Sequence, residues 1–159
     1  MKVTVVAVGK LKEKFYVQAV EEYAKRLSRY CRLEILQVAD EKTPDGASEA
    51  AERQIREKEG KRILSQIKDG AYVIALAIQG EMVTSEGLAE RLERLAVGGN
   101  GHIVFVIGGS LGLSDEVLNR ADWKLSFSRM TFPHQLMRVI LLEQVYRSYR
   151  IQSGEPYHK

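Results

Sequence analysis

Short apolar runs alternate with longer, more polar segments along the chain. Runs rich in Val, Ile, Leu and Ala predict strands at residues 3–8, 72–78 and 102–107, and more weakly at 33–38. A fifth segment, residues 123–127, alternates between apolar and polar positions. The runs at 72–78 and 102–107 do not alternate, which is typical of parallel strands covered on both faces.

Helix-like segments separate these strands. We expect helices at residues 14–30, 48–67, 85–95, 114–119 and 133–151, with Thr84 or Ser85 as an N-cap and Pro133 in the first turn of the last helix. Because strand and helix alternate without a repeat or linker, the pattern predicts one α/β domain over residues 1–159. Its sheet is expected to be mainly parallel and flanked by helices.

Composition and charge narrow the class of protein. No apolar run is long enough to cross a bilayer, the N-terminus lacks a signal-peptide cleavage site, and Cys31 is the single cysteine, so we expect a cytoplasmic protein without a membrane partner. Residues 1–32 hold eight Lys and Arg against three Glu, and residues 129–159 hold five against two, whereas the middle is net acidic. The two basic ends would form a phosphate-binding surface if the fold joins them, although cations that merely solvate helices give the same pattern.

Three loops follow the predicted strand ends, where open α/β sheets usually bind ligands: residues 76–81, 107–112 and 126–134. Gly108 and Gly109 allow a close backbone approach to a ligand, or simply a tight turn. Hydroxyls and apolar side chains of the third loop suit a nucleoside with a thioether-like tail. Alternatively, Thr131 caps the last helix and Phe132 packs in the core.

Several common chemistries lack their motifs. Neither a P-loop nor a complete Gly-x-Gly-x-x-Gly occurs, and no Gly-x-Ser-x-Gly elbow supports a serine hydrolase. The scattered His102, His134 and His158 and the lone Cys31 do not have metal-ligand spacing, so we expect no metal.

Two features near the C-terminus remain. The helix predicted at 133–151 is apolar on nearly all sides, which favours a two-fold homodimer interface over a central core helix of a monomer. The tail, residues 154–159, combines Tyr157, His158 and Lys159, which can stack on a base and touch phosphate, or can be disordered and idle.

Six segments, taken together, resemble the family of ribosomal RNA large subunit methyltransferase H, which is a compact group of SPOUT-class enzymes. The resemblance covers the whole chain in order, and its most specific parts are the Ser-Phe-Ser-x-Met-Thr-Phe-Pro-His block and the Tyr-His tail. The segments are residues 5–12, 58–64, 105–110, 125–138, 143–147 and 156–158.

The resemblance implies a SPOUT fold with a C-terminal trefoil knot, a homodimer, and S-adenosyl-L-methionine as methyl donor without a metal. It also implies methylation of N3 of a pseudouridine in 23S rRNA, on assembled ribosomes. Gly109 and Ser110 are expected beside the donor. The implied donor-binding residues are Leu76, Gly108, Phe127, Ser128, Arg129, Met130, Thr131 and Phe132.

The catalytic roles stay open at this point. Tyr157 and His158 resemble tail residues that reach the partner's pocket, where His158 would take the N3 proton and Tyr157 would place the base. Alternatively, Arg129 or Arg138 stabilises the deprotonated base and water takes the proton. Candidate RNA-backbone contacts, which would otherwise be solvated surface charges, are Lys10, Lys12, Lys14, Arg138, Arg147 and Arg150.

Two other functions compete with methyl transfer. One is a non-catalytic ribosome- or RNA-binding factor of the same fold, which binding of S-adenosylmethionine would exclude. The other is a small-molecule transferase on a Rossmann-like sheet, against which the missing Gly-x-Gly-x-x-Gly and the basic ends argue.

Overall fold

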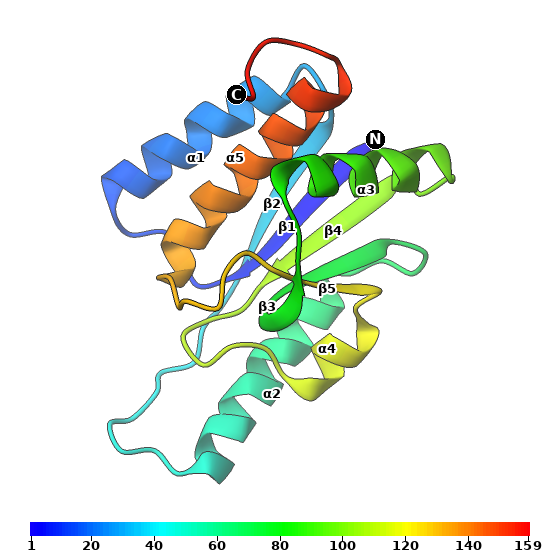
Figure 1. The fold of residues 1–159 in the computed structure, drawn as a ribbon. Coiled ribbons are helices and arrows are strands. Elements are labelled where there is room, and N and C mark those ends of the chain that lie inside the picture. The colour runs from blue at the N-terminus through cyan, green and yellow to red at the C-terminus, as the bar shows by residue number, and fades with distance from the viewer.

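The computed structural model describes residues 1–159, and five strands alternate with five helices along the chain (Figure 1). In chain order the elements are β1 (Lys2–Val8), α1 (Lys14–Leu27), β2 (Arg32–Val38), α2 (Glu49–Ser65), β3 (Tyr72–Met82), α3 (Ser85–Val97), β4 (His102–Ile107), α4 (Asp115–Arg120), β5 (Trp123–Ser126) and α5 (His134–Gln152).

The strands form one parallel sheet in the order β2-β1-β4-β3-β5. This confirms the predicted α/β class with its mainly parallel sheet. Apolar residues of α1, α3 and α5 pack on one face, and those of α2 and α4 pack on the other (Figure 1). The inner strands β1 and β4 are buried on both faces, which explains their unbroken apolar runs. The edge position of β2 explains its weaker pattern.

Strand β3 differs from its predicted extent, since it continues four residues past 78. Its ladder with β5 shifts register, so that both Leu76 and Glu81 lie opposite Leu125. A Cβ at Gly80 would lie 2.7 Å from the Lys124 carbonyl carbon, so only glycine allows this approach of the two backbones. A run of apolar residues does not predict the bend between the two halves of β3.

Side-chain caps fix three helix starts. Thr84 Oγ1 accepts from the Gly87 N–H at 3.0 Å, which confirms Thr84 as an N-cap, and Ser48 and Ser114 cap α2 and α4 in the same way. Thr131 does not cap α5, whose N-cap is Pro133 without a side-chain hydrogen bond. Phe132 is 36% exposed, so it is not the core residue that the capping alternative requires.

Helix α5 lies between α1 and α3 on the sheet (Figure 1). Leu141, Leu142, Val145 and Tyr146 are buried, and the other large apolar residues of α5 are half-buried. Its own chain therefore covers most of the apolar surface that suggested a second copy, and the homodimer stays a prediction. The trefoil knot also stays a prediction. None of the helices has both the length and the apolarity that a membrane span requires.

Candidate functional site

The three predicted loop segments lie on consecutive strands of the sheet, namely β4, β3 and β5. The prediction of a loop at residues 76–81 is wrong, because these residues belong to β3, which bends at Gly80 and continues to Met82. Ala75 is opposite Val106, and Leu76 is opposite Leu125. Gly108 and Phe127 therefore follow the carboxyl ends of β4 and β5, and Leu76 lies at the matching position inside β3, before its bend. Leu76 and Phe127 pack against the same core cluster. This convergence is the arrangement that a shared ligand pocket requires.

The first wall of the candidate pocket is the turn at residues 108–112. Gly109 and Gly112 bridge each other, with Gly112 N–H donating to the Gly109 carbonyl at 3.1 Å. A Cβ at Gly108 would lie 2.8 Å from the carbonyl carbon of Gly112, so the turn closes only over glycine. Apart from this bridge, the backbone N–H groups of Gly108, Ser110 and Leu111 donate no hydrogen bond within the chain, which leaves them for a ligand.

The second wall is the loop between β5 and α5. Ser126 Oγ donates to the Ser128 carbonyl at 3.0 Å, and Ser128 Oγ accepts from the Met130 N–H at 3.0 Å. Among residues 127–132 only Met130 donates its backbone N–H within the chain. Met130 is 71% exposed, and Arg129 is exposed beside it. Free backbone donors beside apolar side chains fit a nucleoside with an apolar extension.

Arg138 is not a surface cation, which corrects its assignment as an RNA contact. It is 2% exposed, and its Nη2 donates to the carbonyls of Val8 and Gly9 at 2.9 and 2.7 Å. Its Nη1 donates to Gln37 Oε1 at 2.9 Å, and burial lowers the pKa of its guanidinium. The side chain therefore ties α5 to the ends of β1 and β2. Being enclosed there, it is also removed as the group that stabilises a deprotonated base.

The C-terminal tail is ordered against its own chain. Tyr157 donates its hydroxyl to Glu143 Oε2 at 2.6 Å, and its ring meets Tyr146 edge-on with centroids 5.0 Å apart. His158 hydrogen-bonds to both Arg147 and Glu86. Burial and the Glu143 bond raise the pKa of Tyr157 to about 12, so this hydroxyl keeps its proton at neutral pH.

The tail and the strand-end loops are separated within one chain. Glu143 lies nine residues into α5, which begins directly after the third loop. At 1.5 Å per residue the tail's anchor is roughly 13 Å along the helix from that loop. Figure 1 shows the red tail turning back at the far end of α5. The structure thus does not bring Tyr157 and His158 to the candidate pocket of their own chain.

The remaining candidate RNA contacts differ in whether they already form an ion pair within the chain. Arg147 pairs with Glu143, and Arg150 pairs with Glu155, so both are already partnered. Exposed side chains without an ion pair are Lys10, Lys12 and Lys14. These lysines follow the carboxyl end of β1, which is the neighbour of β4 in the sheet.

Sequence reasoning missed two glutamates. Glu143 holds both Tyr157 and Arg147, and the signal for it was the i, i+4 spacing from Glu143 to Arg147. Glu59 is buried against the Gly109 turn, and no spacing rule pointed to it.

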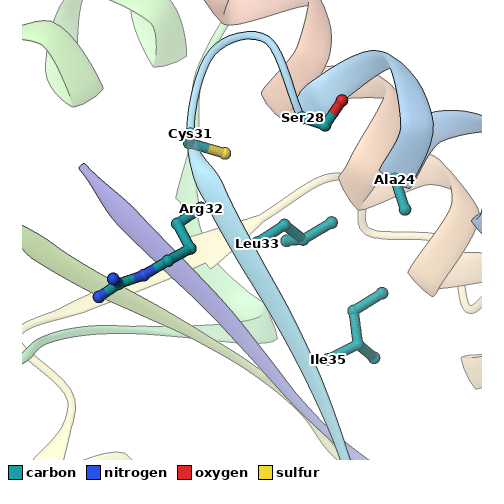
Figure 2. A pocket seen from close by; sticks show the side chains of 6 residues that line it. All are labelled: Ala24, Ser28, Cys31, Arg32, Leu33 and Ile35. Atoms are coloured by element: carbon teal, nitrogen blue, oxygen red, sulfur yellow. The ribbon is translucent and has the colours of Figure 1, made fainter.

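One cavity lies away from these loops. It is a groove of about 680 Å³ between the end of α1 and the start of β2, and no candidate residue lines it (Figure 2). Since the predicted residues gather at the carboxyl ends of the strands, we assign this groove no part in the site. It is lined by Ala24, Ser28, Cys31, Arg32, Leu33 and Ile35.

Comparison with known proteins shows the family of this chain. Residues 1–158 match the family described as predicted SPOUT methyltransferase. Proteins named ribosomal RNA large subunit methyltransferase H from Clostridium perfringens, Clostridium novyi and Bifidobacterium adolescentis are 64%, 62% and 61% identical over 159 residues, covering all of both chains. The solved structure of a probable methylase family protein from Haemophilus influenzae is 10% identical with a TM-score of 0.49, covers 96% of this chain and 66% of that one, and adds nothing to the assignment. The chain therefore belongs to the SPOUT methyltransferase family, and within it to the group of ribosomal RNA large subunit methyltransferase H.

Proposed function

We propose that this chain transfers a methyl group from S-adenosyl-L-methionine to N3 of a pseudouridine in 23S rRNA, on assembled ribosomes in the cytoplasm. The observation that carries the proposal is the 61–64% identity, over the full length of both chains, to proteins named for methylation of large-subunit ribosomal RNA. The convergence of the three strand-end loops supports it independently, because that edge offers unpaired backbone donors beside apolar side chains.

The residues at this edge fit the proposed donor. Backbone N–H groups of the Gly108 turn suit the acceptor atoms of an adenosyl group, and Leu76 with the 127–132 loop supplies apolar surface. When bound, the donor supplies an electrophilic methyl group on a positively charged sulfur. The residues of this chain then contribute by aligning the methyl group with its acceptor, which can lower a barrier by on the order of 7–11 kcal/mol at best. The proposal includes no metal.

The N3 atom of a pseudouridine is an imide nitrogen, which is weakly nucleophilic until its proton leaves. We assign His158 to hold that proton and Tyr157 to pack against the base, with the tail of one copy completing the pocket of its two-fold partner. Separation of the tail from its own loops supports action in the partner rather than in the same chain. Arg129, which is exposed in the loop, is the remaining alternative for stabilising the anion. A trefoil knot around the 127–132 loop belongs to this proposal.

The RNA surface is proposed to run from Lys10, Lys12 and Lys14 over the edge that holds Gly108. Since β1 and β4 are neighbours, these exposed lysines lie beside the candidate pocket, where backbone phosphates flanking the target would pass. Arg147 and Arg150 can contribute only if they exchange their present carboxylate partners for phosphates.

One experiment tests the activity directly. Purified protein is incubated with S-adenosylmethionine and ribosomes from a strain that lacks the methyl group, and 23S rRNA is mapped by mass spectrometry. We expect one added methyl on a single pseudouridine, and little on protein-free rRNA. If calorimetry finds ribosome binding but no binding of the donor, the chain is a non-catalytic ribosome-binding factor and the proposal is wrong.

A further inference from the structure

Helix α2 contacts both ends of the Gly108 turn through two consecutive residues, Glu59 and Gly60. A Cβ on Gly60 would lie 2.3 Å from Ser114 Oγ, so α2 approaches this position as closely as glycine permits. Ser114 is the N-cap of α4, directly after the turn. Glu59 meets the other end of the turn at Gly109. Glu59 and Gly60 therefore hold the two ends of the turn against α2.

The Glu59 carboxyl is enclosed, with 4% of the residue exposed. Its Oε2 accepts from the Glu41 N–H at 2.9 Å, whereas its Oε1 is buried and has no hydrogen-bond partner. A Cβ on Gly109 would lie 3.2 Å from Oε1 and 3.5 Å from Oε2, so the carboxyl packs against the Gly109 backbone. An unpartnered buried oxygen of this kind marks a place where a further group is expected.

No cation forms an ion pair with this carboxyl, although Arg62 is near enough to lower its pKa in part. Arg62 donates instead to Glu41 Oε2 and the Ala39 carbonyl, and the Lys58 ammonium also lies nearest to Glu41. Asp40 adds a further negative charge to the surroundings, and burial raises the pKa of Glu59. Burial thus favours the neutral form of this carboxyl, and a positive group that arrives at the Gly109 turn would favour its ionised form in return.

On the basis of the proposed function, we propose that Glu59 is a specificity-determining residue that makes the pocket prefer the cationic methyl donor over its neutral-sulfur product. Methyl transfer converts the sulfonium of S-adenosylmethionine into the thioether of S-adenosylhomocysteine, which removes one positive charge. Attraction to a fixed carboxylate beneath the pocket therefore falls when the reaction is complete. The residue thus favours entry of the donor and exit of the product.

The test is calorimetry of the full-length protein with three ligands: S-adenosylmethionine, S-adenosylhomocysteine, and sinefungin, in which an ammonium-bearing carbon replaces the sulfonium. Glu59→Gln keeps the shape and an oxygen for the Glu41 N–H but removes the charge. We expect it to weaken both cationic ligands by about three- to tenfold while the thioether changes by less than about twofold. Glu57→Gln, an exposed neighbour on the same helix, is the matched control and should change none of them.

Two further variants separate charge from shape. Glu59→Asp retains the charge and should keep the preference for cationic ligands, even where every affinity falls. Gly109→Ala places a Cβ against Glu59 and Val8, and it should weaken all three ligands alike. Equal losses for all three ligands in Glu59→Gln, or no losses, would overturn the inference. If the unmodified protein binds none of the ligands, the proposed function itself is wrong.

Discussion

The strand-end loops and the C-terminal tail are both expected to meet substrate, yet their polar groups are in opposite states. In the Gly108 turn, the backbone N–H groups of Gly108, Ser110 and Leu111 donate to nothing in the chain. In the tail, Tyr157 bonds to Glu143, and His158 bonds to Arg147 and Glu86. The loops are therefore ready for a ligand, whereas the tail must exchange existing bonds before it acts on a base.

The comparison predicts its largest effect for the tail. Replacement of His158 by Ala should lower the methylation rate on ribosomes by about 10²- to 10⁴-fold, since the proton acceptor is lost, with the donor affinity unchanged. Rates are measured across pH by radiolabelled methyl transfer, with Lys61→Ala, at an exposed position on α2, as control. A variant whose pH profile matches the unmodified protein would remove His158 from the role of base.

A second substitution tests whether Arg138 stabilises the fold rather than acting in the strand-end loops or in the tail. Arg138→Met keeps much of the volume but leaves the Val8 and Gly9 carbonyls without their donor, so we expect a loss of roughly 3 kcal/mol in the free energy of unfolding. Urea titration measures it. The same substitution at the exposed Arg129 should change stability little. Equal stability of the two variants would contradict the burial argument.

The Gly108 turn is expected to determine the affinity for the donor. A change in this turn should not affect the tail. Gly108→Ala forces the backbone away from Gly112, and we expect the donor to bind on the order of ten- to a hundredfold more weakly. Gly101→Ala, before the opposite end of β4, meets no atom within 4 Å and serves as control. Isothermal calorimetry measures the donor affinity of both variants. Unchanged affinity in Gly108→Ala would separate the turn from the donor site.

The smallest effect concerns the basic segment. Lys12→Glu should weaken ribosome binding and lower the slope of log affinity against log salt by about one, because one phosphate contact is lost. Lys68→Glu carries the same charge change on an exposed residue before β3 and should leave the slope unchanged. Filter binding over a salt series gives both slopes. Identical behaviour of the two variants would count against the proposed surface.

Sequence patterns predicted the parts of this fold that depend on local chemistry. Apolar runs located four strands and alternation located the fifth, and Thr84 and Ser114 mark helix starts because a hydroxyl can cap a free N–H. The burial of Arg138 was not predictable, since charge favours the surface and its partners lie 101 to 130 positions away. The bend at Gly80 was missed for the same reason, because the backbone that it approaches belongs to β5.

The residues of the candidate site were also predictable from the sequence only in part. Glycines at the end of a strand pointed to the 108–112 turn, and the resemblance supplied the individual donor residues in the loop after β5. The resemblance includes Glu59 in its segment 58–64 but gives it no role, because one acidic residue in a highly charged helix looks like solvated surface until packing shows that it faces inward. Glu143 was likewise hidden, since its role depends on where the tail returns.

The bonds from Arg138 to Val8 and Gly9 also govern how the polypeptide matures. They join groups separated by about 130 positions, and β1 pairs with β4 across about 100 positions. Contacts of such separation form late and slowly. The bonds that hold the end of β1, an inner strand of the sheet, therefore form only once α5 is present to supply Arg138, which makes them a late step of folding.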